Sequence, residues 1–142
     1  MARITLEIDK KTRAGLNVAL ARIGRELNDE VEALVEKYTD LIYDEARATV
    51  PVRSGRLKKA IEKKLEDLVG EVYVNRKKAP HGSIVEFGSK PHLIKPKDKK
   101  ALAFGDTVVK SVKHPGTKAR PFIIPAFEKH KKPFMDELRR VL

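Results

Sequence analysis

Hydrophobic positions alternate with polar ones near the N-terminus and then change to a helical spacing. Ile4, Leu6 and Ile8 are each followed or preceded by a polar residue, a period of two that predicts a short strand. A strand at this place needs the edge of a sheet, in its own chain or in a neighbour. From about Thr12 to Thr49 apolar residues recur at steps of three, four or five, which predicts one amphipathic helix. Its apolar stripe consists of Leu16, Leu20, Ile23, Leu27, Val31, Leu34, Tyr38, Leu41 and Ala46.

The length of this helix is its most informative property. At ~1.5 Å per residue it would exceed about 50 Å, which is long for a small domain. We therefore expect part of its apolar stripe to pack on a neighbouring subunit. Gly24 is a weak point that allows a bend, because glycine costs roughly 1 kcal/mol relative to alanine in a helix. Pro51 ends the helix, since its ring disfavours the helical conformation of the residue before it.

Shorter elements follow the long helix. Ser54 is a candidate N-cap for a short helix over Gly55–Ile61. Two apolar stretches, Leu65–Val69 and Glu71–Asn75, predict a pair of strands joined by a tight turn at Gly70. Together these elements predict an antiparallel sheet against which the long helix packs.

The third quarter of the chain alternates apolar elements with a basic loop. Ser83–Phe87 is a short apolar element that Gly88 closes. Lys90–Lys100 contains two prolines and five lysines, and it predicts an extended basic loop. Ala101–Phe104 and Thr107–Val112 predict a second hairpin about a Gly-Asp turn.

A terminal helix begins after Arg120-Pro121 and should be kinked or interrupted at Pro133. Its apolar stripe is Ile124, Phe127, Phe134, Leu138 and Val141. The predicted fold class is therefore α+β, with a long N-terminal amphipathic helix packed on a small antiparallel sheet and with a C-terminal helix. We expect one domain over residues 1–142, with an N-terminal strand or arm over residues 1–10 and a basic loop and hairpin over residues 90–118.

Composition narrows the class of partner. The chain has 142 residues, the size of one domain, and a net charge of +11. A basic balance of this size favours nucleic acid, an acidic protein surface or an anionic membrane, without choosing among them. There is no cysteine, hence no disulfide framework. No apolar run approaches the length of a membrane span, so we expect a soluble protein that is made in the cytosol and has no membrane contact.

Candidate catalytic chemistry is sparse. Glu86 is the one acid in an apolar setting bounded by glycine. It could act as a general acid or base if desolvated, but we favour an ion pair with Arg120 or Arg56 that holds the segments together. The four histidines have no metal-ligand spacing, and they are His81, His92, His114 and His130. We expect no enzyme activity, no metal and no cofactor.

Basic residues gather in the loop, and these are Lys95, Lys97, Lys99 and Lys100. Such a run can follow phosphates and would make binding strongly dependent on salt. It lacks the interleaved aromatic residues of a platform for single strands. Passive contact with DNA and a simple solvated basic face both remain open.

Three ordered motifs follow the long helix. Pro51 precedes Ser54-Gly55-Arg56-Leu57, then comes Val85-Glu86-Phe87-Gly88, and then Arg120-Pro121-Phe122 with Pro125-Ala126. In this order, over about Ala46 to His130, they resemble the small head–tail connector, or tail-completion, proteins in the neck of long-tailed bacteriophages. One difference is that His81-Gly82-Ser83-Ile84 stands where this family often has Tyr-Ala.

The resemblance implies a structural protein of the virion. Copies would form a ring, six-fold in this family, between the portal-side proteins of the head and the tube and terminator proteins of the tail. It implies contact with passing DNA, and a location in the neck after synthesis in the host cytoplasm. We expect five residues at the fold's junctions, namely Arg56, Glu86, Phe87, Arg120 and Phe122. For contact with partners or with DNA in the channel we expect Ile4, Leu6 and the four loop lysines.

Two other classes remain as alternatives. The first is a free basic nucleic-acid-binding protein, for which the loop lysines are the evidence. The second is a small hydrolase that uses Glu86 together with a histidine.

Overall fold

The computed structural model describes residues 3–7, 10–97 and 101–142, and it has the expected α+β fold. The elements of the N-terminal half are β1 (Arg3–Glu7), α1 (Lys10–Ile23), α2 (Arg25–Thr49), α3 (Arg56–Ala60), β2 (Ile61–Glu66) and β3 (Val69–Val74). Those of the C-terminal half are α4 (Gly82–Phe87), β4 (His92–Ile94), β5 (Leu102–Phe104), β6 (Thr107–Val109), β7 (Val112–His114) and α5 (Ile123–Val141).

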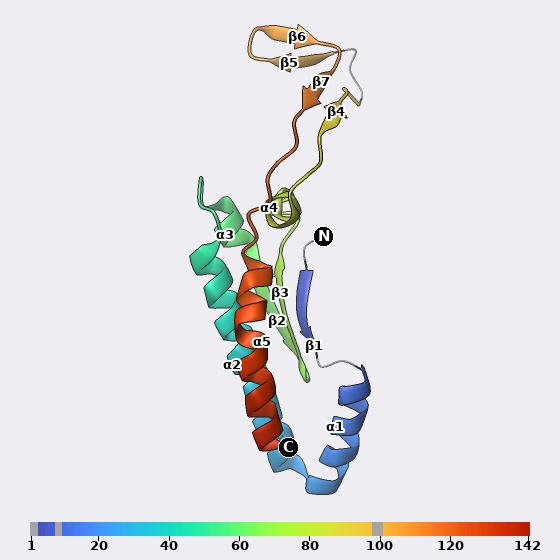
Figure 1. Cartoon of the computed structure of the whole chain (residues 1–142), viewed down its shortest axis with the longest axis vertical. Helices are drawn as coiled ribbons and strands as arrows, with labels where there is room; N and C mark the ends of the chain where they lie inside the picture. The colour runs from blue at the N-terminus through green and yellow to red at the C-terminus, as the bar shows by residue number, and fades with distance from the viewer. Residues whose placement is uncertain (1–2, 8–9, 98–100) are drawn as a thin grey trace.

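The body of the protein is a three-stranded antiparallel sheet with the helices α2 and α5 packed beside it (Figure 1). The strand order is β1-β3-β2, so β3 is the central strand. Its alternate residues Gly70, Val72 and Val74 are buried, and the residues between them are half-buried. This alternation is typical of a sheet with one face on the core and the other face partly open to solvent.

The N-terminal strand pairs within its own chain. Ile4 lies opposite Val72 and Leu6 lies opposite Gly70 on the neighbouring strand β3. The period-two prediction is therefore confirmed for β1, whereas Ile8 lies outside the described residues. The sheet edge that this strand requires is supplied by β3 of the same molecule.

The turn between β2 and β3 lies three residues before its predicted position. The chain reverses at Asp67, whose φ of 50° is in the left-handed region, and Gly70 lies within β3. The prediction of a turn at Gly70 was wrong because this glycine serves close packing. A Cβ atom built on Gly70 would lie 1.8 Å from Oγ1 of Thr39 on α2. The glycine thus permits the close approach of helix and sheet.

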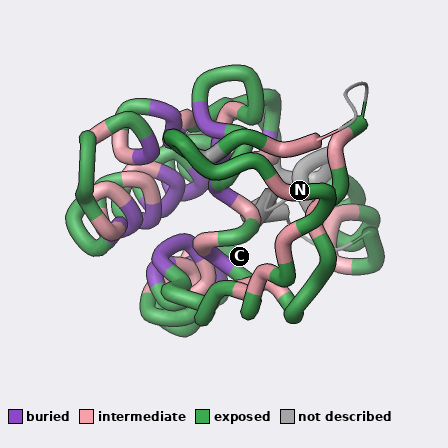
Figure 2. Tube along the Cα trace, turned by 90° about the horizontal axis from the view of Figure 1, so that it is seen from above, coloured by how far each residue is buried: buried purple, intermediate pink, exposed green. Residues whose placement is uncertain are grey.

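The helices α2 and α5 run antiparallel and form most of the core (Figure 1). The Tyr38 ring meets Phe134 edge to face, and its hydroxyl donates a hydrogen bond of 2.7 Å to Glu137. Lys37 forms an ion pair with the same carboxylate at 2.7 Å. Burial and then the bond to Glu137 raise the pKa of Tyr38 to about 12. Figure 2 shows the buried positions of the helices turned toward the interior.

The predicted long helix is two helices. The helix is interrupted at Gly24, and α1 lies near the C-terminal end of β1 instead of extending α2 in a straight line (Figure 1). Leu16 of α1 is buried in the common core. The expectation of one continuous helix was wrong, because the break at Gly24 lets α1 turn back toward the body, and the packing of its stripe on a neighbouring subunit stays a prediction. Leu41 is 39% exposed, whereas Val35 and Ile42 are buried, since a helical period of 3.6 places Leu41 beyond the edge of the core face.

The break between α1 and α2 requires a glycine at position 24, so we expect Gly24→Ala to destabilise the protein. Gly24 has a φ of 87° and a ψ of −169°, a region that is essentially restricted to glycine. Alanine there should lower the free energy of unfolding by about 1–3 kcal/mol, measured by urea denaturation. Gly15→Ala is the matched control, because Gly15 lies inside α1 with open space around it. The free energy of unfolding of Gly15→Ala should rise by about 0.5–1 kcal/mol. Equal effects of the two substitutions would contradict the glycine-specific conformation of Gly24.

Three smaller predictions can be compared with the structure. The short apolar element predicted over Ser83–Phe87, for which the sequence indicated no conformation, is the helix α4, and Gly88 ends it. The helix after Pro51 is confirmed as α3, but Gly55, with a φ of 73°, occupies the N-cap position that was predicted for Ser54. The terminal helix α5 continues through Pro133 without interruption.

Candidate functional site

Glu86 is a buried carboxylate that caps a distant helix. It lies on α4, and its side chain is 2% exposed. Oε2 accepts hydrogen bonds from the backbone N–H groups of Phe122 (2.9 Å) and Ile123 (3.1 Å), and Oε1 accepts one from Ile124 (2.8 Å). These are the N–H groups at the start of α5, which have no partner within the helix. A carboxylate at this position is also favoured by the helix dipole.

The cap connects the second and third sequence motifs. Beside it, the backbone N–H of Arg120 donates to the carbonyl of Val85 at 2.7 Å. The first motif is tied to the same region, because Nε of Arg56 donates to the carbonyl of Lys78 at 2.8 Å, a few residues before α4. Three segments that are far apart in the sequence therefore meet at one place in the fold.

The predicted ion pair of Glu86 is not what the structure shows. Arg56 binds a backbone carbonyl, and the partners of Glu86 are three backbone amides. A helix terminus can replace an arginine here because its amides supply directed donors without burying a second charge. The same bonds occupy the carboxylate on which the hydrolase alternative depended.

The other predicted junction residues differ in burial. Phe122 is fully buried and belongs to the core cluster. Phe87 is 58% exposed although it directly follows Glu86, because the turn of α4 directs the two side chains to different sides. Arg120 is exposed as well. Of the predicted junction set, Glu86 and Phe122 thus lie in the core.

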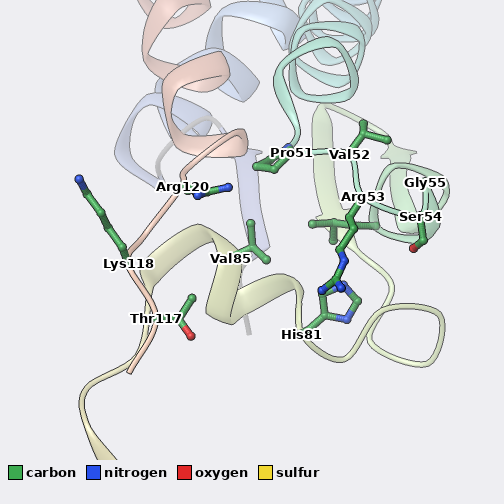
Figure 3. Close-up of a pocket in the computed structure, with 11 residues that line it drawn as sticks. Pro51, Val52, Arg53, Ser54, Gly55, His81, Val85, Thr117, Lys118 and Arg120 are labelled. Atoms are coloured by element: carbon green, nitrogen blue, oxygen red, sulfur yellow. The ribbon is translucent and has the colours of Figure 1, made fainter. Parts of the chain in front are cut away.

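A cleft of about 440 Å³ opens where the three segments meet (Figure 3). Its apolar lining includes Pro51, Leu57 and Val85. Three basic side chains surround it, and they are Arg53, Lys118 and Arg120. Figure 3 shows the loop of Pro51–Gly55 on one side, the extended segment of Thr117–Arg120 on the other and α4 beneath.

The basic residues of the cleft are all exposed, and no carboxylate in the described part of the chain forms an ion pair with them. Sequence reasoning missed the cleft. The motifs mark the segments that line it, but the absence of acidic partners becomes visible only when the segments are placed together. The site therefore combines an apolar floor with uncompensated positive charge.

A long two-stranded arm leaves the body next to this cleft (Figure 1). At its base, Ser89 and Thr117 exchange two backbone hydrogen bonds of 2.9 and 3.0 Å. Further out β4 pairs with β7, and the rings of His92 and His114 stack across this pair at 5.0 Å. The tip is the predicted second hairpin, formed by β5 and β6.

The arm carries the basic loop that the sequence singled out. Lys95 and Lys97 are exposed on it, whereas Lys99 and Lys100 lie outside the described residues. Residues 89–118 contain eight lysines and two aspartates, which leaves a net charge of +6. More than half of the net charge of the whole chain is thus concentrated in this arm.

Neither a metal cluster nor a membrane span was found in the described part of the chain. No three histidine, aspartate or glutamate side chains gather there as a metal ion would require. No helix there combines the length and the apolar character needed to cross a membrane.

Comparison with known proteins supports the resemblance drawn from the motifs. The family model described as "Bacteriophage HK97-gp10, putative tail-component" matches residues 10–88. This stretch runs from the start of α1 to the end of α4 and contains the first two motifs. No curated protein and no solved structure matches the chain at a significant level. Since the match covers more than half of the sequence, the chain belongs to the bacteriophage HK97-gp10 tail-component family.

Proposed function

We propose that this protein forms an oligomeric ring in the neck of a phage, where it completes the tail and joins it to the DNA-filled head. Membership of a phage tail-component family makes it a structural protein of the virion. The observation that carries the finer proposal is the long basic arm, which extends far from the body and leaves most of its surface for contact with other molecules (Figure 1). The basic cleft at the base of the arm adds a second surface for a partner.

In this proposal the whole chain acts as one domain, and six copies form the ring. One side of the ring meets the head-completion or portal-side proteins, and the other meets the tail-tube and terminator proteins. Glu86 and Phe122 hold the body together, with Arg56 and Arg120 supporting the junction. Contact with partners or with passing DNA comes from Lys95, Lys97 and the two neighbouring loop lysines, together with Ile4 and Leu6 on β1. The protein is made in the host cytoplasm and ends in the neck.

Electron microscopy of lysates that lack this gene tests the joining role. We expect DNA-filled heads and separate, finished-looking tails, because the missing ring prevents their union. A plasmid copy of the gene should restore whole particles. Normal infective particles without the protein would overturn the proposal.

A second function, free binding of nucleic acid, is favoured by the charge of the arm. Its exposed lysines could follow a phosphate backbone without reading bases. In that case the isolated protein binds DNA of any sequence with an affinity that falls steeply as salt rises, measured by fluorescence anisotropy. Absence of binding at low salt would remove this alternative.

A further inference from the structure

The arm and the helix α2 carry opposite charges. The arm has a net charge of +6, whereas α2 has eight acidic and three basic residues, a net charge of −5. The two elements also lie apart, because the arm leaves the body beyond the C-terminal end of α2 while the helix extends toward the opposite end (Figure 1). The molecule is therefore electrically polar along its length.

The acidic residues of α2 form a row on its outer face. Their spacing of three, four, four and four places them on one side of the helix, and they are Asp29, Glu32, Glu36, Asp40 and Asp44. The buried residues Val31, Tyr38 and Ile42 lie on the opposite side. Like charges at this spacing repel each other and destabilise the helix. In the described part of the chain only Asp40 of this row forms an ion pair, with Lys63, whose charge also acts on Asp44.

The arm has the complementary surface. Six of its described lysines are exposed and form no ion pair within the described residues, and they are Lys90, Lys95, Lys97, Lys110, Lys113 and Lys118. Two apolar side chains on the same arm are also exposed, Leu93 at 53% and Val108 at 68%. Backbone bonds between Ser89 and Thr117 pair the two strands at the base of the arm, and the arm extends away from the α2 of its own molecule (Figure 1).

We propose that the arm of one copy lies along the outer face of α2 of the next copy, with lysines facing the acidic row. This contact rests on the proposed assembly of copies and specifies how neighbours meet. The contact joins two different surfaces, so each subunit offers one arm and receives another. Such a contact gives a ring when the rotation that relates neighbouring subunits returns to the first subunit. Leu41, which is exposed next to Asp40 and Asp44, provides an apolar spot for the arm.

A second copy fits the observations better than DNA does. DNA would neutralise the lysines of the arm only, and it would leave the acidic row of α2 without a partner. A second copy brings both surfaces together, so that each neutralises charge on the other. Electrostatic complementarity of this kind sets the register of an interface and excludes wrong pairings.

A charge-swap experiment on the full chain tests the contact. One variant carries Lys95→Glu and Lys97→Glu on the arm, and the other carries Glu32→Lys and Glu36→Lys on α2. At moderate salt, sedimentation velocity should show wild-type oligomers and an apparent dissociation constant at least about tenfold higher for each variant alone. An equal mixture of the two variants should assemble again, because each altered surface then finds a complementary one.

Lys77→Glu with Lys132→Glu is the matched control for total charge, since both lysines are exposed and lie outside the arm. This variant should assemble as the wild type does. The proposal is overturned if the arm variant assembles normally, if the mixture stays dissociated, or if the wild type remains monomeric at high concentration. An arm variant that assembles but has lost DNA affinity would assign the arm to nucleic acid.

The joining role is decided separately by microscopy of lysates. Unjoined heads and tails in the deletion, together with a failed charge swap, would retain the neck function and reject only this contact. Whole particles in the deletion would reject the function, whatever the charge swap shows.

Discussion

Glu86→Gln should lower the free energy of unfolding by about 2–4 kcal/mol, the larger of two strong effects that we expect from single substitutions. Both carboxylate oxygens accept backbone N–H bonds from the first turn of α5. A glutamine has one acceptor oxygen, so its amide group would turn a donor toward another donor. The negative charge at the positive end of the helix dipole is lost as well. Denaturant unfolding monitored by circular dichroism measures this change.

Glu128→Gln is the control for this substitution. Glu128 also lies on α5, but it is exposed, and its replacement should change stability by no more than about 0.5 kcal/mol. Hydrogen exchange adds a local measurement, because the amides of Phe122, Ile123 and Ile124 should lose protection in Glu86→Gln before the rest of α5 does. If the two glutamine variants were equally stable, the capping role of Glu86 would be wrong.

Gly70→Ala should destabilise the protein by about 3 kcal/mol, through the packing of α2 on the sheet. The added Cβ would lie 1.8 Å from Oγ1 and 3.0 Å from Cβ of Thr39, so the helix has to move away from β3. Thr39 is itself fully buried and donates to the carbonyl of Val35. The loss should appear in the same denaturant titration as a lower midpoint with an unchanged slope.

A double-mutant cycle identifies the contact that causes this loss. Thr39→Ala removes the hydroxyl that lies closest to the new methyl group. In that background the loss of unfolding free energy caused by Gly70→Ala should be smaller by about 1–2 kcal/mol. Gly15→Ala, in open space on α1, shows the effect of the same substitution without a close neighbour. Additive effects of Gly70→Ala and Thr39→Ala would mean that Gly70 is required for another reason.

Periodicity predicted the elements well where the signal was local. The alternation in β1, the apolar stripe of α2 and the hairpin at the tip of the arm follow from the spacing of neighbouring residues. The motif resemblance was also drawn from the sequence, and the family match over residues 10–88 confirms it. These features need no knowledge of distant contacts.

The roles of two glycines could not be predicted from local spacing. At Gly24 the sequence allowed a bend, but the break followed by the return of α1 to the body depends on core contacts such as those of Leu16. At Gly70 a turn was expected, because turn and close packing use the same residue type. Only the position of Thr39, 31 residues earlier in the chain, distinguishes the two uses.

Local spacing, composition and motif order were enough to predict the α+β class, the main helices and strands, the strong positive charge and the family of this protein. The tertiary structure alone decided that Glu86 caps α5, that three basic residues surround one cleft without acidic partners, and that the basic arm extends away from the acidic row of α2. Hydrogen-bond partners and uncompensated charges depend on distances in space, and residues far apart in the sequence come close only when the chain has folded.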